Sequence, residues 1–110
     1  ALPTGADLVS LVRVAHDHDD PVVAALLAAI HQALPPGGTL ILAEPMAGIA
    51  GAEAMADAYF GLYLWAMGTG RARSPEILIS MLKQAGFASA SPIPTHRPLL
   101  TALIVAKKAA

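Results

Sequence analysis

The chain has 110 residues, of which 55% are hydrophobic and 14% are charged, and its formal net charge at pH 7 is −1. This length holds one small domain with one core, and seven basic residues spread along the sequence exclude the basic patch that nucleic-acid binding requires. The absence of cysteine excludes disulfides and thiolate chemistry, and we expect a reducing, cytoplasmic location.

The mean hydropathy of +0.58 is higher than a self-sufficient domain of this length usually has. We therefore expect apolar surface to face a second copy of the chain, another partner or a further part of the protein. The sequence contains no apolar run of about 18 residues, so no membrane-spanning helix is expected. It begins with Ala1 and lacks the pattern of a signal peptide, as expected of a processed chain or of a piece of a longer one.

The first predicted strand covers residues 8–14 (LVSLVRV). A short apolar run bounded by polar residues is typical of a strand that is buried on both faces of a parallel sheet. The polar cluster HDHDD (16–20) lies at the carboxyl end of this strand, and its last two aspartates are followed by a proline. This order predicts the N-terminus of a helix, and apolar residues then recur with helical spacing over residues 22–34.

PPGG (35–38) ends this predicted helix, and residues 39–46 (TLILAEPM) predict a second buried strand. A strand, a helix, a tight turn and a strand make a parallel crossover unit, so we predict an α/β fold. Residues 50–67 predict a loosely periodic helix that holds four of the five aromatic residues. A further helix over residues 74–86 starts with serine and proline and ends at glycine.

Two more strands are predicted at the end of the chain, over residues 88–94 and 99–108. Only a short linker separates them, which leaves no room for a crossover helix, so this last pair should be antiparallel. The two prolines within 88–94 weaken the prediction of that strand. Residues 1–110 are therefore expected to form one unit with parallel strands, crossover helices and a C-terminal antiparallel pair.

Three interpretations of the HDHDD cluster are open from the residues alone. His16, His18 and Asp20 match the H-x-H-x-D start of binuclear zinc hydrolases, which would need further ligands from elsewhere, such as the other two histidines. Alternatively, Asp19 and Asp20 cap the following helix, because its dipole favours acidic groups, and the histidines are solvated. In the third interpretation, His16 is a general base, because open α/β sheets place catalytic groups at the carboxyl ends of their strands.

A carboxylate next to His16 would orient the imidazole for proton transfer. Glu44 ends the neighbouring predicted strand at an equivalent height, and Asp17 is adjacent in the sequence. Both are therefore candidate partners of the base. Spacing alone is equally compatible with Glu44 as a solvent-facing acid at the end of a strand.

From about residue 7 to residue 108, the sequence resembles the carboxyl-terminal part of S-adenosylmethionine (SAM)-dependent O-methyltransferases of the plant caffeate and flavonoid type and their bacterial relatives. The most specific pieces are HDHDD, where the family has H-D-W-x-D, then LPPGGTLILAEP, and then an R-x-x-E-like stretch before LKQAGF. The resemblance implies the second half of a Rossmann-like methyltransferase sheet, which is a single partial domain, and SAM as the cofactor of the complete enzyme.

Within this family, residues 44–74 resemble bacterial methyltransferases that act on hydroxylated carotenoids such as hydroxyneurosporene. This resemblance implies an apolar small-molecule acceptor with a hydroxyl group, and work close to a membrane surface. An apolar trough would come from the aromatic helix, although a core helix has the same pattern. The residues at helical spacing on its adjoining faces are Phe60, Tyr63, Leu64 and Met67.

The resemblance also implies roles for single residues. The family's general base, which removes the proton of the acceptor hydroxyl, stands at His16, and one of two acids that orient it stands at Glu44. The second acid would be Glu76, displaced by one residue from the family's position. His18 replaces the tryptophan that lies against the adenine of the cofactor. Val12 replaces a lysine, so this contact could run only through the backbone carbonyl.

The glycine-rich loop and the acid that hold the rest of the cofactor in this family do not occur in the sequence. GTGR (68–71) follows a helix rather than a strand, so it predicts a turn and not a nucleotide site. We therefore expect the chain alone to bind little cofactor and to be inactive, and we expect self-association, such as a homodimer, through its apolar edges. A zinc hydrolase and a non-catalytic partner module are the alternative functions.

Overall fold

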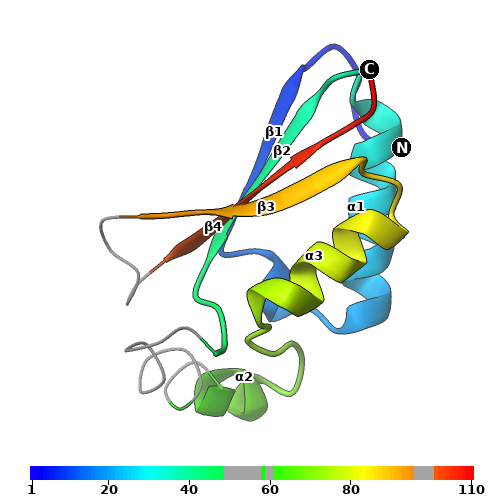
Figure 1. Ribbon diagram of the computed structural model, residues 1–110. Helices are drawn as coiled ribbons and strands as arrows, with labels where there is room; N and C mark the ends of the chain where they lie inside the picture. The colour runs from blue at the N-terminus through cyan, green and yellow to red at the C-terminus, as the bar shows by residue number, and fades with distance from the viewer. Residues whose placement is uncertain (49–57, 59–60, 96–100) are drawn as a thin grey trace.

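The computed structural model describes residues 1–48, 58, 61–95 and 101–110. Four strands form one mixed sheet in the order β1-β2-β4-β3, and Figure 1 shows α1 and α3 on the same face of it. The predicted α/β fold is therefore confirmed. In chain order the elements are β1 (Leu8–Val12), the short 3-10 helix η1 (Ala15–Asp17), α1 (Asp20–Ala33), β2 (Thr39–Glu44), α2 (Gly61–Met67), α3 (Pro75–Gln84), β3 (Ser89–Ile93) and β4 (Ala102–Lys107).

The N-terminal half is a strand–helix–strand unit. β1 pairs in parallel with β2, and α1 connects the two strands, as the sequence predicts. α1 packs one apolar stripe against the sheet because its apolar residues recur every three or four positions. Its buried residues are Val23, Leu27 and Ile30.

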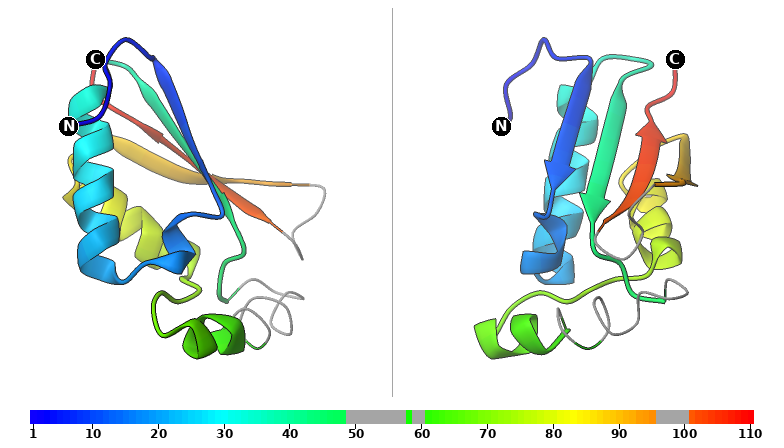
Figure 2. Two further views of the ribbon diagram at one scale, coloured as in Figure 1. Left: turned by 180° about the vertical axis from the view of Figure 1, so that it is seen from behind. Right: turned by 90° about the vertical axis from the view of Figure 1, so that its left-hand side faces the viewer.

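β1 is less buried than the sequence predicts. Leu8 and Val12 have exposed fractions of 51% and 61%, and the strand alternates between exposed and half-buried residues. The sheet order gives β1 a neighbour on one side only, and Figure 2 shows α1 and α3 behind one face of the sheet. The prediction of a strand buried on both faces is therefore wrong for the part of the chain that the structure describes.

The C-terminal half confirms the predicted helix and the antiparallel pair. β4 runs antiparallel to both β2 and β3. The hydroxyl of Ser74 accepts a hydrogen bond from the Ile77 N–H at 3.3 Å, so it caps α3. Beyond the other end of the helix, Gly86 adopts φ +111°, which glycine tolerates best, and Phe87 N–H donates to the Leu82 carbonyl at 3.2 Å.

The functional edge of the sheet is the one where β1 and β2 end, and we call it the carboxyl edge. Because β4 runs against β2, its first residue, Ala102, lies opposite Glu44 at this edge. α2 lies beyond the same edge in both Figure 1 and Figure 2. The remainder of the helix predicted over 50–67 lies outside the described residues. Within those that are described, no helix has the length and apolar character to cross a membrane.

The cap of α3 can be tested by substitution. Ser74→Ala removes the acceptor for the Ile77 N–H, so it should lower the free energy of unfolding by about 1 kcal/mol, measured by urea denaturation. Ser80→Ala is the matched control, because Ser80 is an exposed position inside the same helix and alanine favours helix there. Equal destabilisation by the two substitutions would contradict the capping role.

Candidate active site

The carboxyl edge begins with a sharp change of direction after β1. Arg13 adopts φ 56°, a left-handed conformation that costs a non-glycine residue about 1 kcal/mol. Its N–H still donates to the Ala43 carbonyl at 2.8 Å, so the turn starts directly at the sheet. The chain then enters η1, in which Ala15 and His16 are buried. The first part of the HDHDD cluster is therefore a tight, buried turn and not a solvated loop.

His16 has an exposed fraction of only 5%. Its Nδ1 lies 3.0 Å from Oδ1 of Asp17, whose side chain is 43% exposed. The alignment of these two atoms is not that of a hydrogen bond, but their separation is that of an ion pair when the imidazole carries a proton. The structure thus places Asp17, one of the two predicted partners of His16, next to its imidazole.

Glu44 ends β2 and is fully buried. Burial raises the pKa of its carboxyl group to about 7, while the main-chain N–H groups of His16 and Ala15 and the charge of Arg73 oppose this rise. These groups lie close enough to favour the ionised form, yet neither carboxylate oxygen has a hydrogen bond of good geometry. The structure thus brings Glu44 to the main chain of His16, as the order of the strands predicted.

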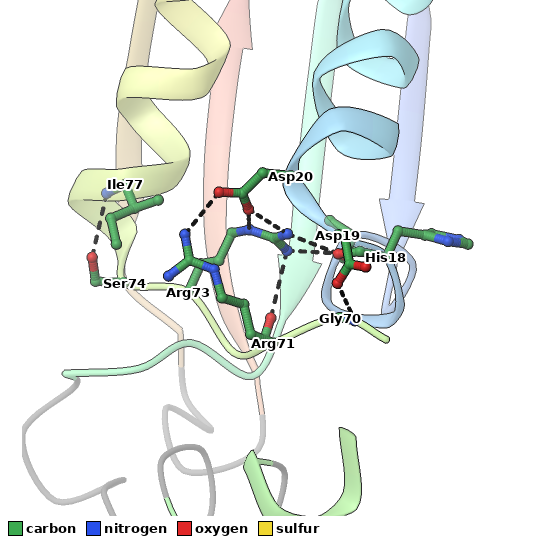
Figure 3. A network of polar contacts seen from close by, with 9 residues as sticks. His18, Asp19, Asp20, Gly70, Arg71, Arg73, Ser74 and Ile77 are labelled. Carbon is green, nitrogen blue, oxygen red and sulfur yellow. Dashed lines mark hydrogen bonds and ion pairs between the residues drawn. The ribbon is translucent and has the colours of Figure 1, made fainter. Parts of the chain in front are cut away.

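The two aspartates that follow do not cap α1 as the sequence suggested. Asp19 occupies the N-cap position, but its side chain makes no capping hydrogen bond, and its Oδ1 accepts from the Gly70 N–H at 2.8 Å instead. Asp20 accepts from Arg71 and from Arg73 (Figure 3). These hydrogen bonds hold the pKa of Asp20 below its usual value, with Arg73 contributing most. Long-range partners have displaced the local cap.

Residues 69–73, which we call the strap, lie against the HDHDD cluster. Thr69 donates from its hydroxyl to the Asp17 carbonyl at 3.1 Å. Gly70 has φ +83°, and a side chain there would overlap the carbonyl oxygen of His16. The Gly68 N–H donates to the carbonyls of Leu64 and Trp65 in the last turn of α2. The chain therefore turns at GTGR, as predicted. The contact of the strap with the cluster was not predicted.

In the zinc interpretation of the cluster, Asp20 would be the third ligand after His16 and His18, but its carboxylate has other partners. Asp20 is held by two arginines, and among the described residues no group of three or more histidine, aspartate or glutamate side chains could hold an ion. His31 packs edge-on against Phe87, with ring centroids 5.1 Å apart. His96 lies outside the described residues.

The predicted cofactor contacts, His18 and Val12, both face the open side of β1. His18 is exposed, and Figure 3 shows its ring pointing away from Asp20 and Arg73. The Arg13 N–H points to β2, so the Val12 carbonyl in the same trans peptide points the opposite way. The side chain of Val12 is exposed as well. This placement leaves both groups accessible to a ligand beside the carboxyl edge.

The other predicted site residues are less closely grouped. Glu76 is exposed in the first turn of α3, so its role as a second orienting acid stays a prediction. Tyr63 and Met67 are exposed on α2, whereas Leu64 is buried. This burial makes Leu64 an anchor of the helix rather than an open contact surface. Phe60 lies outside the described residues.

Comparison with known proteins places this geometry in context. Residues 1–88 match the family model of the O-methyltransferase domain. The chain is 50% identical over 107 residues to demethylspheroidene O-methyltransferase of Rhodobacter capsulatus, covering 97% of the chain and 27% of that protein. The same-named protein of Cereibacter sphaeroides is 42% identical over 105 residues, covering 96% and 28%.

The fold is similar to that of human N-acetylserotonin methyltransferase in complex with SAM, with a TM-score of 0.86 and 27% identity. This match covers 99% of the chain and 31% of the human protein. The chain thus spans little more than a quarter of the length of the curated relatives it matches.

The raised pKa of Glu44 predicts a pH-dependent stability. The ordinary pKa is 4.5 and the folded value is about 7, so this group's contribution is complete below pH 4.5 and is lost as the pH rises through about 7. The difference of about 2.5 pKa units corresponds to about 3 kcal/mol. Glu44→Gln stays neutral, so its free energy of unfolding relative to the wild type should rise by about this amount across the window.

Urea denaturation of both proteins at several pH values measures this difference in the free energy of unfolding. Contributions from the histidines are the same in both proteins and therefore cancel. Glu76→Gln is the control, since Glu76 is exposed and its removal should leave the pH dependence unchanged. Parallel stability curves for Glu44→Gln and the wild type would contradict the buried, protonated state of Glu44.

The close approach of the strap predicts a large difference between two glycines. Gly68 and Gly70 have φ +86° and +83°, but a Cβ at Gly68 meets nothing within 4 Å, whereas one at Gly70 overlaps the His16 carbonyl oxygen and lies 2.6 Å from the Asp17 carbonyl carbon. Gly68→Ala should cost about 1 kcal/mol through backbone strain alone. Gly70→Ala should cost more than about 3 kcal/mol. Thermal unfolding would reveal the difference, and equal losses would refute the contact.

Proposed function

The chain belongs to the O-methyltransferase domain family, and on this basis we propose that it forms the part of a SAM-dependent O-methyltransferase that holds the general base and one wall of the acceptor pocket. The observation that carries the proposal is the buried imidazole of His16 at the carboxyl edge, with Asp17 at 3.0 Å and Glu44 beside its main chain. A buried base beside carboxylates is suited to taking a proton from an alcohol.

In the proposed reaction, the Nε2 of His16 accepts the proton of the acceptor hydroxyl while the oxygen attacks. Asp17 stabilises the resulting imidazolium through its negative charge. When bound, SAM supplies a methyl group to the attacking oxygen, and the electron pair of the broken C–S bond leaves with the sulfur. The protein's contribution is placement of the reacting groups together with proton transfer, which requires no covalent intermediate.

The residues near the open side of β1 fit the cofactor. The exposed ring of His18 offers a flat surface for an adenine, and the Val12 carbonyl points away from β2 toward the same side. Both groups would contact SAM at the carboxyl edge, where α/β sheets bind nucleotides. The human methyltransferase of similar fold was solved in complex with SAM, which supports this cofactor.

We propose a hydroxylated carotenoid as the acceptor. Two relatives, 50% and 42% identical, are demethylspheroidene O-methyltransferases. α2 offers an apolar surface beyond the carboxyl edge, suited to a long apolar molecule. Its exposed apolar residues are Leu62, Tyr63, Trp65 and Met67. An acceptor of this kind partitions into lipid, so we expect the enzyme to work at the cytoplasmic surface of a membrane, as a homodimer.

The role of His16 can be tested in the complete enzyme. His16→Ala should lower kcat by about 10²- to 10⁴-fold, because proton removal from the acceptor is lost. The affinity for SAM, measured by calorimetry, should change little. His18→Ala is the paired comparison, and it should weaken SAM binding while retaining more of kcat at saturating cofactor. An equal loss of turnover and cofactor affinity in His16→Ala would contradict its role as the base.

A further inference from the structure

Arg73 has an unusual environment for a residue in a connecting segment. Its side chain has an exposed fraction of 0%, although it lies between α2 and α3, just before the cap of α3. Nε and Nη2 of its guanidinium donate to Oδ1 of Asp20 at 2.9 and 2.8 Å. A buried cation needs such a neutralising partner, because its desolvation is otherwise very unfavourable.

The remaining donors of Arg73 reach main-chain carbonyls. Nη1 donates to the carbonyl of Ala15 at 3.0 Å and, more weakly, to that of Arg71 at 3.5 Å. Nη2 also donates to the carbonyl of His18 at 2.7 Å. These contacts, together with the two to Asp20, engage all five N–H groups that a guanidinium has. Figure 3 shows the guanidinium between the start of α1 and the turn that precedes it.

Two of these three carbonyls, those of Ala15 and His18, lie on either side of the proposed base in the sequence. Ala15 precedes His16 directly and His18 follows it by two residues, so a single rigid group fixes the main chain on both sides of the imidazole. Arginine suits this task because its planar fork holds several acceptors in a fixed relative orientation, which a lysine ammonium cannot do. Asp20, the first residue of α1, anchors the guanidinium from the opposite side.

We propose that Arg73 is a positioning residue for His16, which acts through the carbonyls of Ala15 and His18 and does not touch the reacting groups. This proposal rests on the proposed function, since it needs His16 to be the base. The strap that carries Arg73 starts two residues after Met67, the last residue of α2, so it connects the helix proposed to contact the acceptor with the turn that holds the base. An acceptor seated on α2 is thereby held in a fixed relation to the imidazole.

The structure provides a matched control for this proposal. Arg71 pairs with the same aspartate, with Nη2 3.0 Å from Oδ2 of Asp20, but its side chain is 51% exposed. Among the described residues, its guanidinium makes no hydrogen bond to the turn around His16. Arg71→Lys therefore removes one guanidinium from Asp20 but leaves the hydrogen bonds between Arg73 and the turn in place. Exposed pairs of this kind contribute little to stability.

The experiment measures kcat and KM of the complete enzyme for the wild type, Arg73→Lys, Arg71→Lys, His16→Ala and the double variant Arg73→Lys/His16→Ala. Arg73→Lys should lower kcat about 10- to 100-fold with little change in the KM of the acceptor, because a small displacement of a catalytic group has effects of this size. Arg71→Lys should stay within about threefold of the wild type. Circular dichroism verifies that each variant is folded.

The double variant gives the decisive comparison, because residues that act as one unit are not additive. In the His16→Ala background, Arg73→Lys should have almost no further effect on kcat. If the two losses multiply instead, Arg73 has no positioning role while the proposed function stands. If His16→Ala keeps most of its turnover, the proposed function fails, and the positioning role fails with it.

A second variant covers the case in which Arg73→Lys does not fold. Asp20→Asn keeps the size of a half-exposed side chain and weakens its hold on the guanidinium, so it should reduce kcat in the same direction and again have no further effect in the His16→Ala background. Unchanged kcat in folded Asp20→Asn or Arg73→Lys would overturn the proposal.

Discussion

Burial of the Arg73 guanidinium is the constraint on which the arrangement of the carboxyl edge depends. A cation that is removed from water is stable only when an anion neutralises it and acceptors take its N–H groups. Asp20 supplies the anion, and the turn around His16 supplies the carbonyls. These partners lie 53 to 58 residues from Arg73 in the sequence. The network therefore closes the start of α1 onto the segment before α3 and shapes the site between them.

The features that could be predicted from the sequence are those with local causes. The apolar runs predict β1 and β2, and the start of α3 is predicted by its N-cap Ser74 and by Pro75, its first residue. The parallel order of β1 and β2 then brings Glu44 to the His16 segment. The partners of Asp19 and Asp20 could not be predicted in this way, because local capping competes for these carboxylates with distant donors, which are the Gly70 N–H for Asp19 and two arginines for Asp20. Only the folded chain shows that the distant partners prevail.

The exposed apolar side chains explain the high mean hydropathy of the chain. β1 carries Leu8 and Val12 at an edge that no described strand covers, and parallel sheets normally have both faces and edges covered. α2 exposes a second apolar surface, and among the residues of this helix with described burial, 62–67, Leu64 alone is buried. The chain spans little more than a quarter of the length of its curated relatives. Composition alone could not distinguish the residues of these two exposed surfaces from those of a core.

The ionisation of Glu44 depends on its burial and on the charges around it. With a pKa of about 7, this carboxyl group is close to half-ionised near neutral pH, and its nearby charges include those of Arg73 and Asp17. The charge of Arg73 favours the carboxylate and so opposes the effect of burial, whereas the charge of Asp17 favours the protonated acid. Burial is the largest of these effects, so the pKa of Glu44 stays well above its ordinary value even though a cation and two main-chain N–H groups lie close by.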